Sequence, residues 1–230
     1  MYRTLLVIAL SGVFTLSHAA DDPTIEGDIM VPPTTHKAAK KAKPAKAAKA
    51  SKNNKNKAAA APKPSAFRIS SPDIQSSSDI DQRFEYDGFG CAGENTSPEL
   101  KWSGAPADTQ SFAVTVYDAD APTGSGWWHW IVYNIPADVT NLDAGVGMLH
   151  SADLPDNAIQ AINDYGAEAW GGMCPPPGDT PHRYIFTVHA LNVEQLDLPE
   201  DSTPAMIRYV INASTIAKAS FTAQYSRPKE

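Results

Sequence analysis

The sequence predicts a mainly β domain, a β-sandwich with one or two peripheral helices. Three segments, residues 111–118, 127–135 and 182–191, alternate apolar and polar side chains with the period of two that a half-buried strand shows. Turns rich in proline and glycine separate them, and the chain holds 19 prolines and 14 glycines. Only one segment has a clear helical period, so the strands set the fold class.

The first two long strands each place a titratable residue among apolar neighbours. In residues 111–118, Phe112, Val114 and Val116 share a face with Asp118. In residues 127–135, strict alternation predicts one face that carries Trp127, His129, Ile131, Tyr133 and Ile135.

The third long strand, residues 182–191, repeats the pattern with Tyr184, Phe186 and Val188 on the face of His182. The predicted helix begins after a cap at Ser202 or Thr203, with Pro204 in its first turn. Its apolar stripe consists of Ile207, Val210, Ile211 and Ser214. Shorter strands are predicted at residues 67–70, 99–102, 159–163 and 220–225.

Residues 1–19 have the pattern of a signal peptide. Arg3 precedes a 12-residue apolar run, residues 5–16, and Ser17-His18-Ala19 offers a small-x-small cleavage site. A membrane anchor is the alternative, but a spanning helix needs roughly 20 apolar residues. We therefore expect cleavage near Ala19 or Ala20 and a periplasmic or secreted protein.

Residues 20–64 form a predicted disordered leader and a basic linker. Residues 37–64 carry ten lysines, no acidic residue and no aliphatic side chain larger than alanine, so they cannot build a core. The linker is either a solvated spacer or a polycation that contacts anionic envelope surfaces or other polyanions. The predicted domain, residues 65–230, has 8 basic and 22 acidic residues, a net charge of −14. This balance argues against a broad basic face for nucleic acid.

Three ionisable residues, Asp118, His129 and His182, stand at or near strand ends beside apolar positions. Such groups are candidates for a functional site, although each alone is more often a satisfied core or edge residue. Motifs around them add weight to the functional interpretation. They are the runs at residues 90–102, 118–122, 124–130, 163–166 and 170–184.

Together these motifs resemble, in order, the phosphatidylethanolamine-binding protein family, and specifically its bacterial Raf-kinase-inhibitor-like branch. The family's D-x-D-x-P element matches Asp118, Asp120 and Pro122, and its Trp-x-His element matches Trp127 and His129. Its last element matches Cys174 to Pro176, Gly178, His182, Arg183 and Tyr184. The resemblance implies a large central sheet packed against a smaller one, and a small cavity that accepts a phosphate or a similar anion.

The resemblance and the local sequence give the predicted ligand-binding set: Asp118, Asp120, Trp127, His129, Tyr165, Gly172, Cys174, Pro176 and His182. The chain departs from the family at three points. Ala119 stands where animal members have proline, Cys174 stands where they have a pocket glycine, and their C-terminal lid helix has no counterpart here. Specificity that depends on that lid is therefore not implied for this chain.

The predicted pocket can be argued from its chemistry. Protonated His129 and His182 can donate to a phosphate, and backbone amides of residues 171–174 can form an anion-binding nest. Asp118 would repel phosphate, so we expect it to orient a histidine or to meet a ligand's ammonium group. Binding should strengthen as the pH falls through the histidine range. Arg183 points to the other side of its strand, where an ion pair with Asp120 is expected.

The two cysteines, Cys91 and Cys174, are expected to form a disulfide. Both lie beside glycines, and an exported protein with an even number of cysteines favours pairing over two buried thiols. The bond would fix the wall of the pocket at residues 171–174.

We therefore expect a binding protein that is not an enzyme and needs no cofactor, with a phosphate or phosphoethanolamine-like headgroup as its ligand. Such a protein could also modulate another protein. Three alternatives remain open at this stage: an interaction or inhibitor module with a vestigial pocket, a metal enzyme that uses the Asp118, His129 and His182 set, and a cysteine hydrolase that uses Cys174 and His182. The sequence also leaves open a homodimer and an unidentified protein partner.

Overall fold

A computed structural model of the chain describes residues 66–76, 79–199 and 201–229. The predicted signal peptide, leader and linker lie outside the described residues, so those assignments stay predictions. The described part is mainly β, with one α-helix, and no helix in it is long and apolar enough to cross a membrane. The predicted fold class is therefore confirmed.

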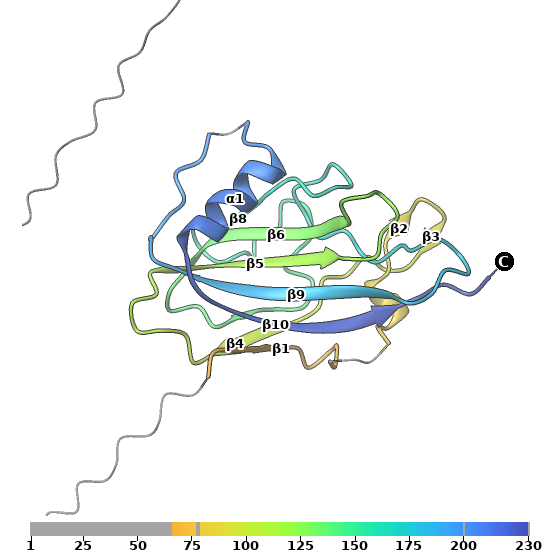
Figure 1. The fold of residues 1–230 in the computed structure, drawn as a ribbon, viewed down its shortest axis with the longest axis horizontal. Coiled ribbons are helices and arrows are strands. Elements are labelled where there is room, and N and C mark those ends of the chain that lie inside the picture. Colours follow the sequence, from red (N-terminus) through yellow and green to blue (C-terminus); the bar gives the residue numbers. More distant parts are fainter. Residues whose placement is uncertain (1–65, 77–78, 200, 230) are drawn as a thin grey trace, which may run out of the picture. The chain divides into compact units, whose positions relative to one another are not determined.

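The large sheet has five antiparallel strands in the order β10-β9-β5-β6-β8 (Figure 1). Its members are β5 (Ser111–Asp118), β6 (Trp127–Pro136), β8 (Ile159–Gln160), β9 (His182–Leu191) and β10 (Thr215–Tyr225). The three predicted long strands are β5, β6 and β9. β10 is longer than the predicted residues 220–225, because it begins directly after the helix and pairs along the length of β9.

Two smaller sheets complete the β structure. The first has the order β1-β4-β7 and consists of β1 (Arg68–Ser70), β4 (Leu100–Ser103) and β7 (Asn141–Leu142). The second pairs β2 (Asp87–Gly88) with β3 (Cys91–Ala92), after a short 3₁₀ turn at Gln82–Phe84. The sequence did not predict β2, β3 or β7, since two residues are too few to show alternation.

The main core lies between the large sheet and the β1-β4-β7 sheet. Apolar side chains of both sheets form one buried cluster there, including Ile69, Leu100, Trp102, Leu142, Val114, Val116, Phe186 and Val188. The other face of the large sheet packs on α1 (Pro204–Ser214), whose Ile207 and Ile211 are buried. Thr203 caps this helix as predicted, since its hydroxyl accepts the amide of Met206 at 3.2 Å.

One register break corrects the predicted face of β6. Val116 pairs with Trp130 and Tyr117 pairs with Trp128, so His129 is an extra residue without an opposite partner, which is a β-bulge. Ile131 and Tyr133 consequently face the α1 side, whereas Ile135, after a second irregularity, returns to the main core. The prediction that one face carries all five alternating residues is therefore wrong. The bulge turns His129 toward the same side as Trp130.

Candidate functional site

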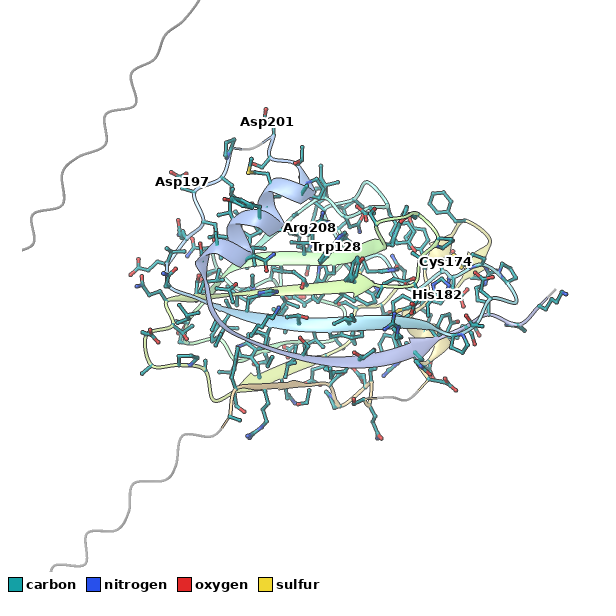
Figure 2. All side chains as sticks on the ribbon, viewed as in Figure 1. Trp128, Cys174, His182, Asp197, Asp201 and Arg208 are labelled. Atoms are coloured by element: carbon teal, nitrogen blue, oxygen red, sulfur yellow. A yellow bond between two sulfur atoms is a disulfide. The ribbon has the colours of Figure 1, made fainter. Side chains whose placement is uncertain are left out.

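A cavity of about 240 Å³ lies at one end of the large sheet. β5 ends there and β6 and β9 begin there, since Asp118 pairs with both Trp127 and Tyr184. Figure 2 shows His182 and Cys174 together at this end, near β2 and β3, with Arg208 on α1 away from them. The cavity is lined by Phe89, Asp118, Ala121, Pro122, Thr123, Trp127, His129, Tyr165, Cys174, Pro175, Pro176 and His182.

Asp118 and His182 form a buried pair in the wall of the cavity. His182 Nδ1 lies 2.7 Å from Asp118 Oδ2, and each side chain is only 4% exposed. Oδ1 of Asp118 accepts the amides of Asp120 and Ala121 at 2.8 and 3.1 Å. Because an ionised carboxylate only accepts, His182 Nδ1 carries a hydrogen. Asp118 therefore orients a histidine, as the sequence suggested, while His182 Nε2 lies 3.6 Å from Asp179.

His129 is held by the backbone of the neighbouring loop. Its Nδ1 lies 2.7 Å from the carbonyl oxygen of Gly171 and 3.1 Å from that of Gly172, and both carbonyls can only accept. Nδ1 therefore carries a hydrogen, and Nε2 is buried without a hydrogen-bond partner. Burial lowers the pKa of His129, although the two carbonyls and Asp118 oppose that effect. The resting ring is thus neutral, with a lone pair on Nε2.

Aromatic rings build one wall of the cavity. Tyr165 stacks on Tyr86 with ring centroids 4.0 Å apart, and it meets the edge of Trp127 at 5.2 Å and Phe89 at 5.9 Å. The hydroxyl of Tyr165 donates to the carbonyl of Gly172 at 2.9 Å, and burial raises its pKa, so the phenol stays neutral. The indole N–H of Trp127 is buried without a partner. Trp127 and Tyr165 are therefore in the positions predicted for cavity walls.

The rim of the cavity is cross-linked. Cys91 and Cys174 form the predicted disulfide, with Cα atoms 5.9 Å apart. The guanidinium of Arg227, which follows β10, donates to the carbonyls of Gly90 and Pro175, one on each side of this bond. Since Cys174 is bonded, it offers no free thiolate, and the cysteine-hydrolase alternative loses its nucleophile.

Two predicted site residues lie outside the cavity lining. Asp120 forms a paired contact with Arg183, with Oδ1 2.7 Å from Nη2 and Oδ2 2.8 Å from Nε. These hydrogen bonds lower the pKa of Asp120 to about 2 and confirm the expected ion pair. Gly172 packs against backbone, and its amide donates to the Asn95 side chain at 2.7 Å.

The first two amides of the predicted anion-binding nest, those of Gly171 and Gly172, do not point to a ligand. The amide of Gly171 donates to the carbonyl of His129 at 2.9 Å, and that of Gly172 is held by Asn95. Both donors are used inside the protein, so they cannot serve a ligand. The loop at 171–172 instead turns its carbonyls toward His129 and Tyr165.

Five lining residues were absent from the predicted ligand-binding set: Phe89, Ala121, Pro122, Thr123 and Pro175. Ala121 and Pro122 belong to the motif at residues 118–122, and Pro175 follows Cys174, so sequence proximity could have found these three. Phe89, which is 79% exposed with a positive φ of 53°, gave no sequence signal. Within the described residues, no group of three or more His, Cys, Asp or Glu side chains is arranged to hold a metal ion.

Comparisons with known proteins agree with this architecture. The family model described as phosphatidylethanolamine-binding protein matches residues 70–226. UPF0098 protein YbcL of Escherichia coli strain K12 is 49% identical over 161 residues, which are 70% of this chain and 88% of the relative. UPF0098 protein YbhB of the same strain is 45% identical over 159 residues, 69% of this chain and 99% of the relative.

Solved structures give the same result. The crystal structure of E. coli YbcL, described as a new member of the mammalian PEBP family, matches with a TM-score of 0.68 and 48% identity. It covers 70% of this chain and 99% of that one. A Chlamydia trachomatis PEBP homologue matches with a TM-score of 0.59 and 29% identity, over 70% of this chain and 98% of that one. The chain therefore belongs to the phosphatidylethanolamine-binding protein family.

Proposed function

We propose that this chain is an exported binding protein without enzymatic activity, whose cavity takes a small phosphate-bearing headgroup such as phosphoethanolamine. The observation that carries the proposal is that Asp118, Trp127, His129 and His182 line one cavity. Buried polar atoms almost always have hydrogen-bond partners. His129 Nε2 and Trp127 Nε1 have none within the described protein, and because both atoms are buried, a ligand pairs with them only after the side chains shift.

The size of the cavity favours a headgroup over a whole lipid. About 240 Å³ is below the range of roughly 300–1,000 Å³ that is usual for drug-sized ligands. The aromatic wall and the prolines of the rim suit the short apolar part of such a ligand. The carboxylate of Asp118, which lies beside His182, adds an acceptor for the ammonium group of a zwitterionic headgroup.

Export is supported by the sequence and by the disulfide. The apolar run at residues 5–16 and the small residues after it fit a cleaved signal peptide. The bond between Cys91 and Cys174 fits an oxidising compartment, the periplasm or the exterior. In this proposal the lysine-rich residues 37–64 tether the domain to anionic envelope surfaces.

The test is calorimetric titration of the protein with phosphoethanolamine at pH 6, with His129→Ala as the site variant. His189→Ala is the matched control, because His189 is also a buried histidine of the large sheet but does not line the cavity. We expect saturable binding to the wild type and the control, and at least tenfold weaker binding to His129→Ala. Equal binding by all three proteins would place the ligand elsewhere, and no binding by any would favour an interaction module with a vestigial pocket.

A further inference from the structure

The loop at residues 163–171 holds the bulged part of β6. Because His129 is the extra residue of the bulge, it has no opposite residue on β5. On the other side of β6, β8 pairs only with Val132 and Tyr133. The backbone of Trp128 and His129 is held on that side by the loop instead.

Asp164 and Gly171 supply the backbone contacts between the loop and the bulge. The Trp128 amide donates to Asp164 Oδ2 at 2.8 Å, and the Asp164 amide donates to the Trp128 carbonyl at 3.0 Å. The Gly171 amide donates to the His129 carbonyl at 2.9 Å, while His129 Nδ1 donates to the Gly171 carbonyl at 2.7 Å. The orientation of the imidazole therefore depends on where the loop places Gly171.

Asn163 ties this loop together through its side chain, and the residue is only 2% exposed. Nδ2 donates to the carbonyl of Ala169 at 2.8 Å and to that of His129 at 3.3 Å. Oδ1 accepts the amides of Tyr165 at 2.9 Å and Ala167 at 3.1 Å. These four contacts use both hydrogens and both lone pairs of the side-chain amide. One side chain thus joins the turn that carries Tyr165 to the carbonyl of the bulged residue.

The same turn sets the place of the Tyr165 ring in the cavity wall. The ring meets the edge of His129 with centroids 5.7 Å apart, and its hydroxyl donates to the carbonyl of Gly172 at 2.9 Å. The packing is close, because a Cβ at Gly171 would overlap the ring of Tyr165 and lie 3.1 Å from Asn163 Nδ2. A shift of the turn would therefore move both the Tyr165 ring and the carbonyls that hold His129.

From these contacts, and resting on the proposed function, we infer that Asn163 is a positioning residue for headgroup binding, which acts through His129 and Tyr165 without lining the cavity. The amide nitrogen is the essential part of the side chain. A carboxylate at this position would keep both acceptor contacts and lose both donor contacts. It would also repel the carbonyls of Ala169 and His129, so the imidazole and the Tyr165 ring would lose their relative placement.

The experiment compares Asn163→Asp with Asn134→Asp. Asn134 is the matched control because it is also a buried asparagine, 5% exposed, whose Oδ1 accepts the Leu196 amide at 2.7 Å, and it does not line the cavity. We expect Asn163→Asp to bind phosphoethanolamine at least tenfold more weakly at pH 6. The imidazole nitrogen resonances of His129 should also shift in the ligand-free variant. Asn134→Asp should stay within twofold of the wild-type affinity and keep the His129 resonances.

Asn163→Ser makes the test independent of a buried charge. Its hydroxyl can still accept the amide of Tyr165, but it is too short to donate to the carbonyl of His129. We expect the same loss of affinity and the same direction of shift in the His129 resonances, with cooperative denaturant unfolding as the check that the variant is folded. This variant carries the test if Asn163→Asp does not fold.

The outcomes separate this inference from the proposed function. Wild-type affinity or unchanged His129 resonances in a folded Asn163 variant would overturn the inference and leave headgroup binding intact. An equal loss of affinity in Asn134→Asp would also overturn it, because any buried carboxyl group would then have the same effect. Absence of binding by the wild type at pH 5.5 and 7.5 would overturn both.

Discussion

His182 Nδ1 and Asp118 Oδ2, 2.7 Å apart, join the first residue of β9 to the last residue of β5 in a pair that is 4% exposed on each side. The pair holds His182 in one tautomer, with the hydrogen on Nδ1. It also closes the end of the sheet where the cavity lies, so it serves both stability and the shape of the site.

Asp118→Asn tests this pair. The side-chain amide of Asn keeps an oxygen that accepts from the backbone, but it presents an N–H to His182 where the carboxylate had an oxygen. The hydrogen on His182 Nδ1 then has no acceptor, so this tautomer is no longer favoured. We expect the free energy of unfolding to drop by about 2 kcal/mol and the ring hydrogen to move toward Nε2, which nitrogen-15 NMR of the imidazole detects. The control is Asp120→Asn, in an exposed pair, which should cost no more than about 1 kcal/mol. A wild-type imidazole spectrum in Asp118→Asn would contradict the assignment.

The disulfide between Cys91 and Cys174 should contribute strongly to stability. The two residues are 83 positions apart, and closing a loop of that length gives about 4–5 kcal/mol in the chain-entropy model. We expect the Cys91→Ser, Cys174→Ser double variant to unfold at a clearly lower denaturant concentration. A reductant should lower the wild-type midpoint to the same value and leave the variant unchanged. A loss below about 1 kcal/mol would show that the loops are fixed mainly by other contacts, such as those of Arg227.

Gly172→Ala should be strongly destabilising. A Cβ at this position would overlap the carbonyl of Phe84 and the amide of Tyr86, which are backbone groups that cannot rotate away. We expect a loss of about 3 kcal/mol in thermal or denaturant unfolding. At Gly124, by contrast, a Cβ meets nothing within 4 Å, so Gly124→Ala should cost only about 1 kcal/mol for its positive φ. Equal losses of stability in the two variants would contradict the expected steric overlap at residue 172.

Stability should fall in acid partly through His189. Burial, with Lys218 as a smaller cause, lowers the pKa of His189 to about 4, compared with 6.5 when the ring is exposed. Below pH 6.5 His189 takes up a proton in the unfolded chain, whereas in the folded chain it takes one up only near pH 4. The free energy of unfolding therefore decreases as the pH falls from 6.5 to 4. The linkage amounts to about 3 kcal/mol. Denaturant titrations at pH 7 and pH 4.5 should show most of this loss, and it should shrink in His189→Gln. An undiminished loss in that variant would exclude His189 as a cause.

Much of the fold was predictable from the sequence because the long strands alternate large apolar residues with smaller or polar ones, although both faces of β5 are buried. β5 and β9 keep a strict period of two, so their bounds match the predicted segments. β6 breaks that period at His129, and no residue type in the sequence marks a bulge there. The predicted face was wrong for this reason. β2, β3 and β7 are held by tertiary contacts and are too short to leave a pattern.

The candidate site was predictable where motifs fix the chain locally. Asp118, His129 and His182 stand near strand ends that antiparallel pairing brings together, so they line one cavity. Two features needed the three-dimensional structure. The amides of residues 171 and 172 are used by partners distant in sequence, His129 and Asn95. Phe89 lines the cavity because the disulfide between Cys91 and Cys174 holds the loop of Phe89 beside residues 174–176.

The most direct test of the central claim is a proton–nitrogen NMR titration of the indole N–H groups with phosphoethanolamine. Three tryptophans, Trp102, Trp127 and Trp170, have buried indole nitrogens without a partner in the described protein, and only Trp127 lines the cavity. If the headgroup binds in the cavity, the Trp127 resonance shifts and saturates while those of Trp102 and Trp170 stay in place. A titration that leaves Trp127 unmoved, or that moves all three alike, would contradict headgroup binding at this site.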